Sequence, residues 1–73
     1  MNIKKQLGMR SQYLRKQKGY SQLTFSYEIG VNKNYLCDLE KGRRNPTLEI
    51  LEKICKGLEL NLEDLFKGIV ELK

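Results

Sequence analysis

The chain has 73 residues and a formal net charge of +5, with 40% hydrophobic and 32% charged residues. This length suits one small domain with a thin margin of stability, because such a chain buries only ~60% of its unfolded surface. Two cysteines and no histidine argue against a disulfide framework and a zinc site, and no apolar run is long enough to cross a membrane. We read no signal peptide and expect a cytoplasmic protein without a metal or cofactor.

The positive charge is concentrated in the first part of the chain. Residues 1–44 hold ten Lys/Arg against three Asp/Glu, a balance of +7, whereas residues 45–73 hold four against six, a balance of −2. A strongly basic segment favours nucleic acid as a partner, although a generic solvated surface would show the same excess.

The spacing of apolar residues predicts a compact all-α domain of five helices, in chain order at residues 3–17, 22–29, 33–41, 48–57 and 62–66. In the first helix Ile3, Leu7 and Leu14 share one stripe, which Ser11 interrupts. Gly19 is expected to end this helix with a positive φ.

The second and third helices are short and are joined by a glycine. Ser21 is the expected N-cap of the helix at 22–29, with Tyr20 packing on Phe25 across the cap. Gly30 supplies the positive φ that a sharp turn needs, and Asn32 caps the helix at 33–41. This layout, at about residues 21–42, is how a small protein places a helix end in the DNA major groove.

The last two helices follow a basic loop and carry most of the remaining core. Thr47 and Asn61 are their expected N-caps. The apolar positions at helical spacing are Leu48, Leu51, Ile54, Cys55, Leu58, Leu65 and Phe66. Cys55 is interpreted as inert core packing.

The start of the helix at 33–41 holds the residues best suited to read DNA. Its first amides have no intrahelical partners and lie at the positive end of the helix dipole, so a phosphate or base edge is a natural ligand. Lys33 suits guanine, Asn34 suits adenine, and Asp38 can accept from cytosine N4. The remaining candidates for contact with DNA are Gln22, Tyr35, an exposed Cys37, Lys41, Arg43, Arg44 and Asn45. Lys33 and Asn34 could instead be a solvated helix start, Arg43 and Arg44 plain loop charges, and Tyr35 a side chain packed against the loop.

The chain resembles the helix-turn-helix family of phage Cro and repressor proteins over about residues 7–66. The resemblance rests on the order of Arg15, the Gly-aromatic-Ser-Gln of residues 19–22, Gly30-Val31, the Leu-Glu-Lys-Gly of residues 39–42, Asn45-Pro46 and the run at residues 62–66. It implies a five-helix domain that binds operator DNA, with Gln22 clamping a phosphate and with Asn32, Lys33, Asn34 and Cys37 facing DNA. It also implies an inner ion pair between Arg15 and Glu40. Small restriction–modification controller proteins of this family look similar in length, share the Arg44-Asn45 step and act as homodimers.

Three residues depart from the family pattern. Ser26 stands where alanine is usual and needs a hydrogen bond, which we expect to go to a backbone carbonyl one turn back. Ser11 replaces a branched apolar residue and so removes core volume. Asp38 would repel phosphate unless it pairs with a cytosine or a neighbouring lysine.

We therefore expect a sequence-specific transcription regulator that binds double-stranded DNA as a homodimer. A dimer seam is predicted at Ile50, Ile69, Val70 and Leu72, although these side chains could instead cover the domain's own core. The alternative is an antitoxin or interaction module, in which the acidic second half binds a toxin and DNA binding is auxiliary. An enzyme fits least, because the sequence offers no histidine, no paired-carboxylate cleft and no glycine-rich phosphate loop.

Overall fold

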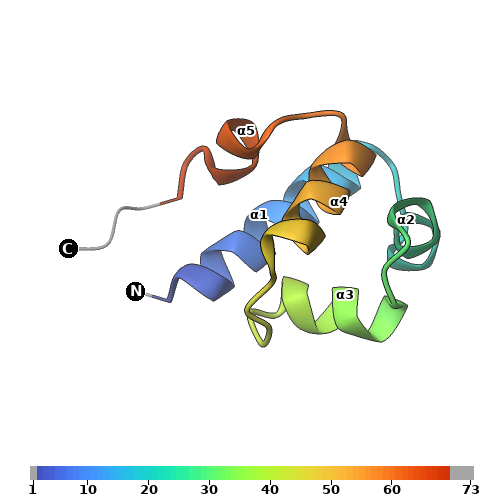
Figure 1. Ribbon diagram of the computed structural model, residues 1–73, viewed down its shortest axis with the longest axis horizontal. Helices are drawn as coiled ribbons and strands as arrows, with labels where there is room; N and C mark the ends of the chain where they lie inside the picture. Colours follow the sequence, from blue (N-terminus) through green and yellow to red (C-terminus); the bar gives the residue numbers. More distant parts are fainter. Residues whose placement is uncertain (1, 70–73) are drawn as a thin grey trace.

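A computed structural model describes residues 2–69, and within that range the chain forms five helices and no strand (Figure 1). The helices are α1 (Ile3–Gln17), α2 (Gln22–Ile29), α3 (Lys33–Glu40), α4 (Leu48–Leu58) and α5 (Leu62–Phe66). Two ends differ from the prediction by one residue: α3 stops at Glu40 with Lys41 as its C-cap, and α4 continues to Leu58 with Glu59 as its C-cap. The all-α prediction is confirmed.

The helices pack around α1, which contacts α3, α4 and α5. In Figure 1, α3 runs along one outer edge of the molecule and α5 lies at the opposite edge, with α1 and α4 between them. Helix α2 packs on both α3 and α4 and so connects these two helices. This arrangement leaves one side of α3 without a covering helix among the described residues.

The predicted caps and turns are confirmed. The side chains of Ser21, Asn32, Thr47 and Asn61 each accept hydrogen bonds from amides in the first turn of their helices. Gly19 and Gly30 adopt φ values of +82° and +70°. The rings of Tyr20 and Phe25 lie 5.3 Å apart between centroids, which closes the start of α2 on the core.

The core draws on all five helices. Its buried side chains are Leu7, Phe25, Ile29, Leu36, Leu39, Leu51, Ile54, Cys55, Leu58 and Leu65. Burial raises the pKa of the Cys55 thiol, and the nearby charge of Asp64 adds to that rise, so the group stays a neutral packing element. The expected core position of Leu48 is wrong: it is the first residue of α4 and its side chain is 75% exposed.

Helices α1 and α3 approach closely at Gly8. A Cβ atom there would overlap the Leu39 carbonyl oxygen and lie 2.7 Å from the Glu40 carbonyl oxygen. Nearby, the buried Ser11 hydroxyl has no hydrogen-bond partner among the described residues. The Ser26 hydroxyl donates to the Leu23 carbonyl at 2.7 Å, as its position one turn along α2 predicts.

A buried ion pair joins α1 to α3. Arg15 Nε lies 2.7 Å from Glu40 Oε2, and Arg15 Nη2 lies 3.1 Å from Glu40 Oε1. The side chains are only 5% and 1% exposed. Arg15 Nη1 also donates to the Tyr20 carbonyl at 2.7 Å, so one guanidinium ties α1, the start of α2 and the end of α3 together.

The pair predicts a large asymmetry between single and double substitutions. Glu40→Ala leaves the buried Arg15 cation without its partner and should lower the free energy of unfolding by about 3–5 kcal/mol. Replacing both residues with methionine removes both buried charges and should recover most of that loss. Urea unfolding followed by circular dichroism measures both, and equal losses in the single and double variants would contradict this role.

Candidate nucleic-acid interface

The start of α3 is presented to solvent. Asn32, Lys33 and Asn34 are all exposed, and α3 lies at the outer edge of the molecule (Figure 1). The backbone amides here are less available than predicted, because Asn32 Oδ1 accepts from the amides of Asn34 at 2.8 Å and Tyr35 at 3.3 Å. The groups offered outward are therefore the side chains of Lys33 and Asn34, at the positive end of the helix dipole.

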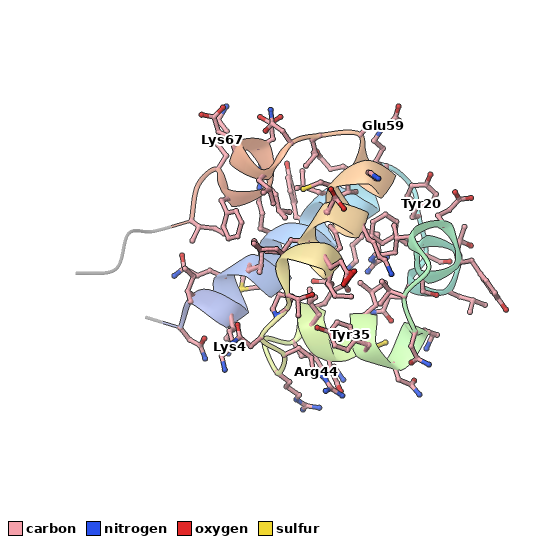
Figure 2. The ribbon with its side chains drawn as sticks, in the orientation of Figure 1. Lys4, Tyr20, Tyr35, Arg44, Glu59 and Lys67 are labelled. Carbon is pink, nitrogen blue, oxygen red and sulfur yellow. The ribbon has the colours of Figure 1, made fainter. Side chains whose placement is uncertain are left out.

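The loop after α3 carries the remaining predicted cations. Lys41, Arg43, Arg44 and Asn45 are all exposed. Gly42 makes the turn with a φ of +78°, and the Arg43 amide donates to the Asp38 carbonyl at 2.9 Å, which folds the loop back on α3. Figure 2 shows Arg44 at the outer edge of the molecule, on the side of α3. We call Lys33, Asn34, Lys41, Arg43, Arg44 and Asn45 the basic face.

Tyr35 and Asp38 both interact with the arginines of this loop. The Arg44 guanidinium carbon lies 5.1 Å from the centre of the Tyr35 ring. Asp38 lies between Arg43 and Arg44, at 3.9 Å and 3.6 Å from their nearest nitrogens. In the free protein the carboxylate is thus paired with two arginines, which the turn at Gly42 brings within its reach.

Gln22 is held by contacts that the sequence did not predict. Its Nε2 donates to Glu40 Oε1 at 2.9 Å, and its Oε1 accepts from the Cys37 thiol at 3.0 Å. The contact with Glu40 uses one of the two hydrogens on Nε2. Cys37 is half-buried by this contact rather than exposed as expected, and Lys33 Nζ lies 4.0 Å from its sulfur.

The predicted dimer seam is only partly described. Ile50 and Ile69 are half-buried and pack against the domain's own core. Val70 and Leu72 lie outside the described residues. Between residues 2 and 69, no helix is both long and apolar enough to cross a membrane, and no cluster of three or more acidic or cysteine side chains forms a metal-binding group.

Comparisons with known proteins agree with this geometry. A family model described as helix-turn-helix matches residues 12–65. The control protein C.MunI of Mycoplasma sp is 39% identical over 69 residues, which is 93% of each chain. The control protein C.BamHI of Bacillus amyloliquefaciens is 34% identical over 65 residues, covering 88% of this chain and 80% of that protein.

A solved structure shares the fold over most of its length. The restriction-modification controller protein C.AhdI from Aeromonas hydrophila superposes with a TM-score of 0.84 at 32% identity, covering 86% of this chain and 96% of that one. With two short helices joined at Gly30 and the start of the second turned outward, the chain belongs to the helix-turn-helix family of DNA-binding transcriptional regulators.

Proposed function

We propose that the protein regulates transcription, without enzymatic activity, by binding operator DNA in the cytoplasm as a homodimer with α3 in the major groove. The observation that carries this proposal is the exposed start of α3, with Lys33 and Asn34 beside a loop of exposed cations. An α-helix fits the major groove, where side chains can reach base edges. The similarity to C.MunI, C.BamHI and C.AhdI favours the role of a restriction–modification controller.

The proposed contacts fall into two classes. Lys33 and Asn34 read bases, because they project from the first turn of α3, and Asn32 stands beside them as its N-cap. Gln22, Tyr35, Lys41, Arg43, Arg44 and Asn45 contact phosphates and set the position of the helix. The Gln22 amide is already oriented by Glu40 and Cys37, so binding costs it little conformational freedom.

Support for a homodimer comes from exposed apolar side chains on α4 and α5. Leu48 and Leu62 are 75% and 43% exposed, at the starts of α4 and α5. Both line a groove of about 510 Å³ together with Cys55 and Leu60. An exposed apolar surface of this kind suits contact with another chain, and Ile50 lies on the same helix as Leu48.

Binding to a duplex should depend steeply on salt. If Lys41, Arg43 and Arg44 each neutralise one phosphate, the plot of log affinity against log salt should have a slope of about −2.7 per protomer. Fluorescence anisotropy of a labelled duplex across a salt series measures this slope. A flat response would contradict a phosphate-bound basic face.

Substitutions should separate base reading from phosphate contact. Asn34→Ala should relax the preference at one base position, with a loss of about 1–3 kcal/mol for the best site only. Arg43→Ala should weaken binding to all duplexes alike and make the salt slope shallower by about 0.9. Selection from a random duplex pool, followed by affinity measurements, tests both, and a uniform loss in both variants would show that base reading is assigned to the wrong residue.

The assembly state distinguishes the homodimer from the antitoxin alternative. The free chain should sediment as a dimer at micromolar concentration, and paired Leu48→Ser and Leu62→Ser substitutions should shift it toward monomer without loss of helix content. Bound half-sites should lie about one helical turn, ~34 Å, apart or a multiple of that. A chain that stays monomeric both free and on DNA would favour the interaction module.

A further inference from the structure

We propose that Asp38 is a specificity-determining residue, which restrains Arg43 and Arg44 in the free protein and disfavours DNA that offers no base amino group to its carboxylate. This inference rests on the proposed DNA-binding function. Among the described residues, Asp38 is the only acidic side chain that contacts these two arginines. Its proposed effect is to weaken non-specific binding to DNA, which a count of positive charges does not suggest.

The geometry defines an ionic latch, formed by Asp38, Arg43 and Arg44. Asp38 Oδ1 lies 3.9 Å from Arg43 Nη1, and Asp38 Oδ2 lies 3.6 Å from Arg44 Nη2. The backbone bond from the Arg43 amide to the Asp38 carbonyl holds the loop in reach of the carboxylate. Arg44 is also stacked on Tyr35, one helical turn before Asp38.

This latch is weak enough to open when DNA arrives. The side chains of Arg43 and Arg44 are 67% and 50% exposed, and that of Asp38 is 34% exposed. Ion pairs with this much solvent contribute little to stability and are screened by salt. The phosphates of any duplex can therefore draw the arginines away from Asp38.

Opening the latch leaves the carboxylate beside a polyanion. Asp38 lies four residues after Asn34 on α3, so the two side chains share one face of the helix. In a groove that Asn34 reads, the free carboxylate meets either a base acceptor, which repels it, or a base amino group, most favourably that of cytosine, which donates to it. The energetic cost of releasing the arginines thus depends on the DNA sequence, and specificity arises partly from a penalty on wrong partners.

The test compares two variants that each raise the net charge by one. Asp38→Asn removes the carboxylate of the latch, and Glu28→Gln removes an exposed carboxylate near the end of α2, where no ion pair within residues 2–69 involves it. Affinities are measured for the duplex that the unsubstituted protein selects from a random pool and for a shuffled duplex of the same composition. Thermal unfolding verifies that each variant is folded.

We expect Asp38→Asn to bind the shuffled duplex about 3- to 10-fold more tightly, while Glu28→Gln changes this affinity by less than about 2-fold. On the selected duplex Asp38→Asn should gain nothing or lose affinity, so its ratio of specific to non-specific affinity should fall by about tenfold or more. A selection repeated with Asp38→Asn should lose one cytosine preference.

A coupling measurement tests the latch itself. In a chain that also carries Arg43→Ala and Arg44→Ala, Asp38→Asn should tighten non-specific binding by less than it does with both arginines present, because only the repulsion between the carboxylate and the DNA is then removed. An unchanged specificity ratio, or the same gain with and without the arginines, would overturn the inference. If the unsubstituted protein selects no sequence and shows no salt dependence, the proposed function fails instead.

Discussion

The buried ion pair between Arg15 and Glu40 is the constraint on which the position of α3 depends. It links the last turn of α1 to the last residue of α3, and the same guanidinium holds the loop before α2 through the Tyr20 carbonyl. The two helices can approach this closely because Gly8 has no side chain to place between them. A buried pair of this kind contributes less to net stability than its distances suggest, since both charges lose their hydration. Its value here lies in fixing one orientation of α3 relative to α1 and α2.

Hydrogen bonds connect this ion pair to the proposed DNA-binding surface. Glu40 accepts from Gln22, which in turn accepts from Cys37, so the pair in the core is continuous with the side chain proposed to clamp a phosphate. Directly after Glu40, the turn at Gly42 and the hydrogen bond from the Arg43 amide to the Asp38 carbonyl fix the loop that carries the arginines. The side chains on the surface therefore start from defined positions, which lowers the entropic cost of binding.

The parts of the fold that depend on local chemistry could be predicted from the sequence, and those that depend on tertiary contacts could not. The N-caps follow from side chains that accept hydrogen bonds from nearby backbone amides. The glycine turns follow from the absence of a Cβ atom, which allows a positive φ. The predicted end of α4 is one residue too early, because the C-cap is Glu59, which adopts a φ of +59°. In this position the Glu59 carboxylate accepts a hydrogen bond from Lys18, the C-cap of α1, at 2.7 Å. That contact also lowers the pKa of Glu59. In the candidate site, the burial of Cys37 and the arginine partners of Asp38 depend on a helix crossing and a loop path that spacing alone does not reveal.

The central claim is that the first turn of α3 meets the bases, and a titration of the isotope-labelled protein with its selected duplex tests it most directly. Resonances are followed for each backbone amide and for the side-chain amide of Asn34. We expect the largest changes at residues 32–35 and 41–45 and at the side chain of Asn34, with smaller changes on the outer faces of α4 and α5. Changes concentrated on α4 and α5, with the Asn34 side chain unaffected, would contradict it.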